Sequence, residues 1–116
     1  TEDGVEPLFK QVAKLAAGKW NANNNCLLVL GATEPQQMAE IRDLVGDMVF
    51  LVPGIGAQGG DLKAMLNAGL RTDGKGLIVS SSRSILYASQ GADFAEAARA
   101  AALNLRNEIN RYRQVQ

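Results

Sequence analysis

The sequence predicts an α/β fold in which parallel strands alternate with helices. Three strand-length runs are continuously apolar rather than alternating with polar residues, and they lie at 26–30, 48–52 and 76–80. Such runs are typical of strands in a parallel sheet that helices cover on both faces. The segments between them have helical periodicity, and their connections have the length that βαβ units use. The expected order is therefore α-β-α-β-α-β-α.

The first helix is expected over residues 7–20, because apolar residues recur there at helical spacing. The residues predicted to face inward are Leu8, Val12, Leu15 and Ala16. Gly18 and the asparagine-rich segment 21–25 end this helix. The first strand, 26–30, begins at Cys26, the single cysteine of the chain. We expect Cys26 to be a small core residue, since a lone cysteine predicts no disulfide framework.

The second helix is expected over residues 34–44, where Pro35 stands inside a capping-box pattern. Its inward residues would be Met38, Ile41 and Val45. The third helix is expected over 61–67, with Asp61 as its N-terminal cap and Gly69 as its C-terminal cap. Its inward residues would be Leu62, Met65 and Leu66.

A short helical turn at 85–88 and a long last helix are expected after the third strand. Asp93 is predicted to cap the last helix. The residues that share its predicted inward face are Phe94, Ala97, Ala98, Ala101, Leu105 and Ile109. Arginines near its C-terminal end are favourable for the helix dipole.

Three parallel strands on their own would leave two open edges and bury little on one face. The expected order also begins with a helix and lacks the strand that should precede it. We therefore expect the C-terminal part of a (β/α)₈ barrel, a fold that needs roughly 200–250 residues. No linker divides residues 1–116, so they are expected to be one segment, from the fifth helix to the eighth, with the N-terminal part of the barrel absent.

The composition excludes several classes of function. The chain has 12 Lys plus Arg and 12 Asp plus Glu, so its net charge indicates no nucleic acid or anionic membrane as partner. It has no histidine, which removes Ser-His and Cys-His catalysis and nearly every zinc site. No transmembrane helix is expected, because the longest apolar runs have strand length, and no signal peptide is recognised.

Residues 53–61, with the sequence Pro-Gly-Ile-Gly-Ala-Gln-Gly-Gly-Asp, directly follow the second strand. The loop glycines would leave backbone N–H groups unshielded and able to point at an oxyanion; they are Gly54, Gly56, Gly59 and Gly60. In many (β/α)₈ barrels a phosphate lies between the loops after the seventh and eighth strands. If the three strands are the sixth to the eighth, those loops are 53–61 and 80–84.

Within these loops, Arg83 would offer a planar charged donor to phosphate oxygens, and Gln58 a neutral amide. The backbone N–H groups of Ser82 and Arg83 would complete the site. Spacing alone leaves phosphate binding and a simple tight turn equally open for the glycine loop. A lone arginine is more often solvated or salt-bridged. Their occurrence at consecutive strand ends favours the phosphate site.

The segment 53–61, together with 28–35 and 80–88, resembles the orotidine 5′-phosphate decarboxylases. The similarity is to the bacterial subfamily with a Gly-Ala-Thr-x-Pro segment, here residues 31–35, and to its C-terminal portion. Segments 94–99 and 107–112 also fit, so the resemblance covers essentially the whole chain.

This resemblance implies a cytoplasmic homodimeric (β/α)₈ barrel that converts orotidine monophosphate to UMP and CO₂ without a metal or organic cofactor. Gln58, Ser82 and Arg83 would hold the substrate phosphate, while Pro53 and Ile55 would line the apolar wall beside the base. The family's catalytic Asp-x-Lys-x-x-Asp array lies on an earlier strand and is absent here. The isolated segment is therefore predicted to be inactive, with the N-terminal part of the barrel as its partner.

Two rival functions stay open at this stage. One is another phosphate-binding barrel enzyme of the same superfamily, such as a sugar-phosphate decarboxylase. The other is a non-catalytic half-barrel that binds phosphate or self-assembles. Tight binding of a 6-substituted uridine monophosphate by the whole enzyme, against none for a sugar phosphate, would separate the decarboxylase from the first rival. The intact mass of the purified sample would separate it from the second, because a second polypeptide with the Asp-x-Lys-x-x-Asp array supports the enzyme and a lone stable oligomer supports the half-barrel.

Overall fold

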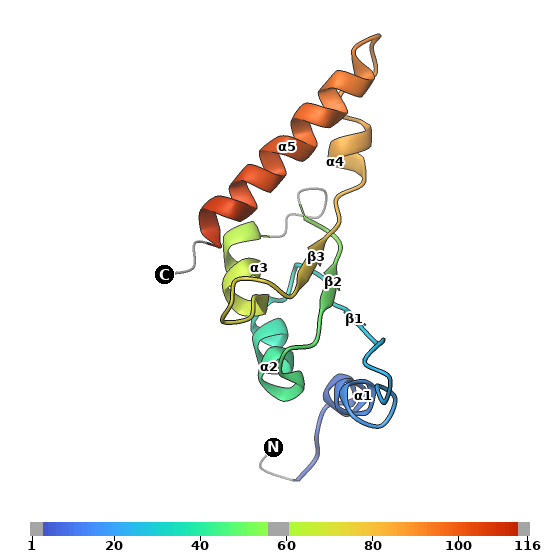
Figure 1. The fold of residues 1–116 in the computed structure, drawn as a ribbon, viewed down its shortest axis with the longest axis vertical. Coiled ribbons are helices and arrows are strands. Elements are labelled where there is room, and N and C mark those ends of the chain that lie inside the picture. Colours follow the sequence, from blue (N-terminus) through green and yellow to red (C-terminus); the bar gives the residue numbers. More distant parts are fainter. Residues whose placement is uncertain (1–3, 56–60, 114–116) are drawn as a thin grey trace.

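The structure, a computed structural model, describes residues 4–55 and 61–113. Its three strands form one parallel sheet in the order β1-β2-β3 (Figure 1). The predicted α-β-α-β-α-β-α order is confirmed, and the short helical turn expected before the last helix is present as α4. The elements are α1 (Leu8–Ala17), β1 (Leu28–Val29), α2 (Pro35–Val45), β2 (Phe50–Val52), α3 (Leu62–Gly69), β3 (Leu77–Val79), α4 (Arg83–Leu86) and α5 (Phe94–Tyr112).

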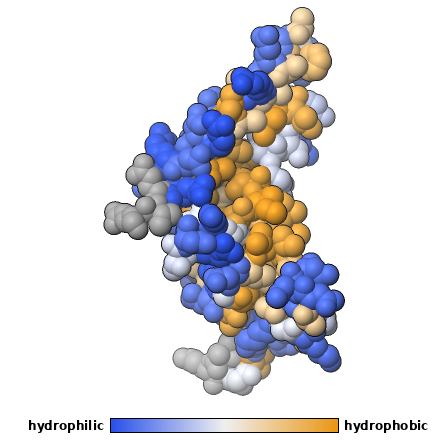
Figure 2. Space-filling view, in the orientation of Figure 1, coloured by the Kyte–Doolittle hydropathy of each residue, from blue (hydrophilic) through white to orange (hydrophobic). Residues whose placement is uncertain are grey.

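The sheet is covered by helices on one face and open on the other. Phe50 and Val52 point to the covered face, and both are fully buried. Val29, Leu51 and Ile78 are in register across the strands and point to the other face, because successive side chains of a strand alternate. On that face Val29 is 66% exposed and Ile78 is 51% exposed. This confirms the expectation that three strands without the rest of a barrel bury little on one face, and an apolar surface lies open over the strands (Figure 2).

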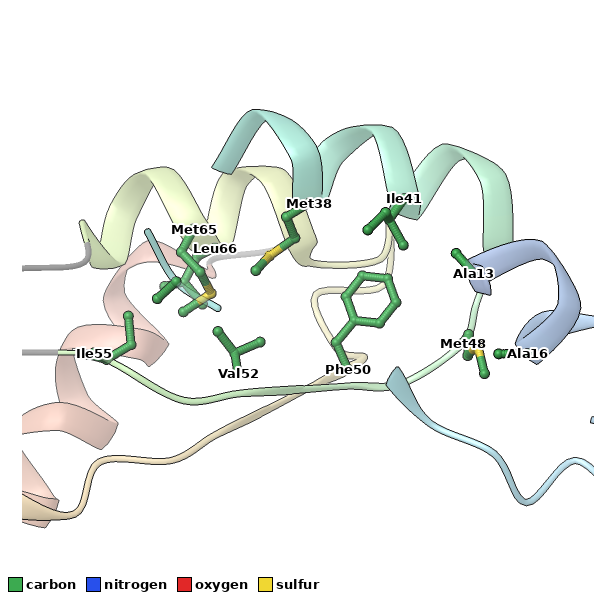
Figure 3. Close-up of a cluster of buried hydrophobic side chains, with 11 residues drawn as sticks. Ala13, Ala16, Met38, Ile41, Met48, Phe50, Val52, Ile55, Met65 and Leu66 are labelled. Atoms are coloured by element: carbon green, nitrogen blue, oxygen red, sulfur yellow. The ribbon is translucent and has the colours of Figure 1, made fainter. Parts of the chain in front are cut away.

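The core lies between the covered face of the sheet and helices α2 and α3 (Figure 3). Met38, Ile41, Met65 and Leu66 are buried there, which confirms their predicted inward positions. Gly69 allows α2 to approach α3 closely: a Cβ atom on Gly69 would lie 2.5 Å from the Met38 sulfur. Gly69 is the last residue of α3 rather than its cap, because the helical hydrogen bonds continue to Leu70.

Helix α1 packs against α2 through Ala13 and Ala16, which are buried. The prediction that Leu8, Val12 and Leu15 also face inward is wrong, since these side chains are 74%, 42% and 42% exposed. The apolar stripe of α1 is wider than the surface that α2 and β1 offer to it. Part of that stripe borders an apolar hollow of about 530 Å³ between α1, β1 and α2.

Helix α5 contacts the core only near its C-terminal end, where Leu105 and Ile109 are partly buried. Its N-terminal half extends beyond the sheet beside α4 (Figure 1), so Phe94, predicted to face inward, is 60% exposed. Asp93 occupies the N-cap position without capping the helix. Its carboxylate accepts a hydrogen bond from the Ser89 hydroxyl instead. Across the residues that the structure describes, no helix has the length and apolarity needed to cross a membrane.

Arginine side chains hold together the N-terminal ends of β2 and β3. The Arg42 guanidinium donates hydrogen bonds to four carbonyl oxygens, at 2.6–3.3 Å, and these belong to Gly46, Met48, Gly69 and Gly76. Burial lowers the pKa of Arg42, and the nearby charge of Arg71 acts in the same direction. These bonds join the ends of α2 and α3 to the starts of β2 and β3.

Arg71 and Arg113 extend this arrangement around the turn before β3. Arg71 forms an ion pair with Asp73 at 2.8 Å and donates to the carbonyl oxygen of Asp47 at 3.2 Å. Arg113 donates to the carbonyl oxygen of Gly74 at 2.8 Å, which attaches the end of α5 to the same turn. This end of the sheet is thus occupied by structural contacts.

Candidate phosphate-binding site

The opposite end of the sheet gathers the three loops that follow the strands. Parallel strands end at one edge, and the backbone keeps their ends together. The Ala32 N–H donates to the Pro53 carbonyl oxygen at 3.3 Å, and the Ser80 N–H donates to the Val52 carbonyl oxygen at 3.1 Å. The loops after β1, β2 and β3 therefore start side by side, as a ligand site at the carboxyl end of a barrel requires.

The loop after β2 starts with Pro53, Gly54 and Ile55. Gly54 has a φ of 93°, a conformation that favours glycine because it has no Cβ. Asp61, at the other end of the loop, accepts a hydrogen bond from the Ala64 N–H at 3.1 Å, which confirms it as the cap of α3. The remaining predicted loop residues lie outside the described residues; they are Gly56, Gln58, Gly59 and Gly60.

The loop after β3 leads directly into α4, with Ser82 at the N-cap position and Arg83 as the first helical residue. The helical turn expected at 85–88 thus begins two residues earlier. Its hydrogen bonds run from the Leu86 N–H to the Ser82 carbonyl oxygen at 2.8 Å and from the Tyr87 N–H to the Arg83 carbonyl oxygen at 2.9 Å. This short helix fixes the backbone conformation at Arg83.

Arg83 is exposed at the start of α4. The ion pairs found among the described residues all involve other side chains. Of the two ordinary alternatives for a lone arginine, the structure thus favours a solvated side chain over a salt-bridged one. A guanidinium in this state keeps its donor groups available to an anion.

The two residues predicted to form a wall beside a base lie in different surroundings. Pro53 is partly buried at the edge of the sheet. The Ile55 side chain is only 5% exposed and belongs to the hydrophobic core, where it lies near Val52 and Met65 (Figure 3). Ile55 therefore supports the loop from below in this structure. Its contact with a base stays a prediction.

One residue that the sequence reasoning did not single out lies between the two loops. The Ser81 hydroxyl donates to the Ile55 carbonyl oxygen at 3.3 Å and also contacts the Ser84 hydroxyl. The run of serines at 80–82 after an apolar strand was the available signal, because serine hydroxyls often bond to nearby backbone in turns.

The described part of the chain brings together no group of three or more His, Cys, Asp or Glu side chains that could hold a metal ion. The polar groups at this edge are hydroxyls, backbone N–H groups and the Arg83 guanidinium. These groups can bind and orient an oxyanion.

Comparison with known proteins gives a consistent result, although no protein-family model matches the chain. The orotidine 5′-phosphate decarboxylase of Cellvibrio japonicus is 66% identical over 108 residues, which are 93% of this chain and 39% of that protein. The chain thus spans about two fifths of the length of the curated relatives that it matches.

Two solved structures from Leishmania donovani share the fold. The UMP synthase has a TM-score of 0.80 and 46% identity, over 95% of this chain and 23% of that one. The OMP decarboxylase has a TM-score of 0.77 and 44% identity, over 95% of this chain and 40% of that one. In sequence and in fold, the chain therefore matches the C-terminal portion of orotidine 5′-phosphate decarboxylase, a part of a (β/α)₈ barrel.

Proposed function

We propose that this chain supplies the substrate-phosphate site of an orotidine 5′-phosphate decarboxylase, the enzyme that forms UMP and CO₂ in pyrimidine biosynthesis. The observation that carries the proposal is the 66% identity over 108 residues to a decarboxylase of that name. Because the chain covers 39% of that relative, the activity belongs to a complete protein that contains this segment.

In the proposed site, Arg83 binds the phosphate dianion through its guanidinium, and the N–H groups of Ser82 and Arg83 bind it through the backbone. Gln58 and the glycines of the same loop approach the phosphate from the side of β2. Pro53 and Ile55 form the apolar side toward the base. The exposed position of Arg83 and the hydrogen bonds that hold the ends of β2 and β3 together support this arrangement.

The chemistry requires groups that this site does not have. Loss of CO₂ from the pyrimidine ring leaves a carbanion that must take up a proton. A guanidinium and backbone amides bind anions but are poor proton donors at neutral pH. From the resemblance to the family, we assign the proton donor to the lysine of the Asp-x-Lys-x-x-Asp array on the remaining part of the barrel. Without that part, the segment binds phosphate at most and stays inactive.

Binding of the phosphate nevertheless contributes to the rate of decarboxylation. Binding energy from a remote part of a substrate can stabilise the transition state by ordering the site and closing loops over it. No cofactor takes part in this scheme. The complete protein is a cytoplasmic homodimer, in which β1, β2 and β3 are the sixth, seventh and eighth barrel strands.

The missing part of the barrel would cover the open face of the sheet. Val29 and Ile78 leave apolar surface exposed there, and β1 and β3 are edge strands of the three-stranded sheet. An exposed apolar face with open edges is a poor surface for an isolated domain. The N-terminal part of the same enzyme is the partner that we assign to it.

A chimaeric enzyme tests the proposal. In it, this chain replaces the matching 108-residue segment of the Cellvibrio japonicus decarboxylase, and conversion of orotidine monophosphate to UMP is followed by chromatography. We expect activity close to that of the parent enzyme, tight binding of a 6-substituted UMP and no activity from the segment alone. A folded chimaera that binds a sugar phosphate but no uridine monophosphate would overturn the proposal.

A further inference from the structure

Ser81 joins the two loops that form the candidate phosphate site. Its hydroxyl reaches back to the carbonyl oxygen of Ile55, at 3.3 Å, in the loop after β2. It also contacts the hydroxyl of Ser84, which follows Arg83 in α4. We propose that Ser81 is a positioning residue that holds Arg83 in a fixed position relative to residues 53–55, the described start of the loop after β2. This inference rests on the proposed phosphate site.

The direction of the hydrogen bonds follows from the chemistry of the groups. A carbonyl oxygen can only accept, so the single Ser81 proton goes to Ile55. The contact between the two hydroxyls is then made by the Ser84 proton, with the Ser81 oxygen as acceptor. The result is a series of two hydrogen bonds that runs from Ser84 through Ser81 to Ile55. It connects the first turn of α4 to the backbone at the end of β2.

The Ile55 end of this series of hydrogen bonds is held in the hydrophobic core. Ile55 is 5% exposed and packs in the core together with Val52 and Met65. The backbone hydrogen bonds between β2 and β3 extend as far as the one from the Ser80 N–H to the Val52 carbonyl oxygen. Ser81 lies one residue beyond that bond, so its side chain continues the connection where the strands separate.

Helix α4 depends on this connection because the core does not bury its side chains. None of its four residues is buried, and its main contacts are with α5, whose N-terminal half extends away from the sheet (Figure 1). Among the side-chain hydrogen bonds of the described residues, the one from the Ser81 hydroxyl to the Ile55 carbonyl oxygen connects the segment that leads into α4 to the segment after β2. Because Arg83 is the first residue of α4, the position of α4 sets the position of Arg83.

Loss of this hydroxyl should affect phosphate recognition more than base recognition. A single hydrogen bond contributes about 0.5–1.5 kcal/mol, so we expect Ser81→Ala to weaken UMP binding by about twofold to twelvefold. Binding of uridine, which has the base and ribose but no phosphate, should change less than twofold. A general loosening of the fold would weaken both ligands equally.

The test uses the chimaeric enzyme and measures the affinities for UMP and uridine, with kcat and KM for orotidine monophosphate. Ser81→Thr retains the hydroxyl and should restore most of the UMP affinity. Ser84→Ala should have a smaller effect, because Ser81 still donates to Ile55. Ser89→Ala is the matched control, since it removes a hydroxyl that donates to Asp93 in the loop before α5, away from the sheet. We expect it to leave both affinities unchanged.

The outcomes separate this inference from the proposed function. If Arg83→Ala weakens UMP binding while Ser81→Ala leaves it unchanged, the positioning role is wrong and the phosphate site stands. If neither substitution changes the ratio of UMP to uridine affinity, both proposals are wrong. An equal loss for UMP and uridine in Ser81→Ala would assign Ser81 a purely structural role and overturn the inference, whatever the melting temperature of the variant.

Discussion

The guanidinium carbon of Arg42 lies 3.8 Å from the centroid of the Phe50 ring. Phe50 is fully buried at the start of β2, and the same guanidinium donates to carbonyl oxygens from two helix ends and two strand starts. One side chain thus combines a cation–π contact with the hydrogen bonds that the ends of α2 and α3 need. This makes Arg42 a structural residue, remote from the loops after the strands.

Replacing Arg42 should therefore reduce stability without changing the active-site chemistry. Arg42→Met retains an unbranched apolar side chain but leaves several carbonyl oxygens without a donor, so we expect the free energy of unfolding of the chimaera to fall by about 2–4 kcal/mol. Urea denaturation followed by circular dichroism measures this change. Arg42→Lys should recover only part of the loss, because lysine lacks the planar donor fork. The control Arg99→Met, at an exposed position of α5, should change stability by less than 0.5 kcal/mol, as is typical of surface substitutions.

Gly69→Ala should also destabilise the protein, for a steric reason. The added methyl would lie 2.5 Å from the Met38 sulfur and 3.2 Å from Leu77, and Met38 is itself 1% exposed. Overpacking of this kind costs about 1–3 kcal/mol, measured as a shift in the urea midpoint. Gly31→Ala is the matched control, because the nearest atom to its added methyl lies 4.0 Å away. Equal stabilities for the two variants would contradict the close approach of α2 and α3.

Arg83→Ala should mainly change catalysis. Removing the charged partner of a substrate phosphate in a desolvated site costs about 2–5 kcal/mol, a roughly 30- to 5,000-fold fall in kcat/KM for orotidine monophosphate. Steady-state kinetics of the chimaera measure it. Arg99→Ala controls for the loss of a surface charge and should keep the parental kcat/KM. An unchanged kcat/KM in Arg83→Ala would remove Arg83 from the proposed site.

The ion pair between Arg71 and Asp73 should make stability depend on pH. The hydrogen bond from Arg71 is the main cause that lowers the pKa of the Asp73 carboxyl, and the Lys75 N–H adds a smaller effect. A carboxyl whose pKa is lower in the folded state stabilises the protein above its ordinary titration range, near pH 4. That contribution disappears as the pH falls through the lowered pKa.

Asp73→Asn should therefore be less stable than the parent chimaera at pH 7, and the difference should shrink as the pH falls below about 4. Thermal unfolding at a series of pH values measures the difference. Asp43→Asn, which removes an exposed carboxylate on α2, is the control for the loss of a surface charge at pH 7. A difference that stays constant down to pH 2 would mean that the ion pair does not contribute to acid sensitivity.

The sequence predicted the helices and strands well where local patterns determine them. Asp61 is a cap in the structure because an aspartate before an apolar helix can accept an N–H bond from its first turn. Met38 and Met65 are buried because their helical faces meet the sheet within the chain itself. The resemblance also identified the partial barrel correctly, since the glycine-rich segment and Arg83 occur at fixed positions relative to the strands.

The errors arise where burial depends on a neighbouring surface. Leu8 and Phe94 have the right periodicity for a buried face, yet both side chains are exposed, because no described element lies against them. Asp93 has the right position for a cap, but Ser89 offers a competing hydrogen bond. The hydrogen bond from Ser81 to Ile55 could not be predicted, because the two residues are 26 positions apart in the sequence.

The arginines at the starts of the strands have a practical consequence for protein engineering. Arg42, Arg71 and Arg113 reinforce one end of the sheet, whereas Ser81 and Arg83 lie at the other end. Stabilising substitutions around the arginine-rich end can therefore be screened by heat challenge with little risk to the candidate phosphate site. Libraries of variants that alter ligand preference can be confined to the loops after the strands. They can be built on a variant that was first stabilised at the arginine-rich end.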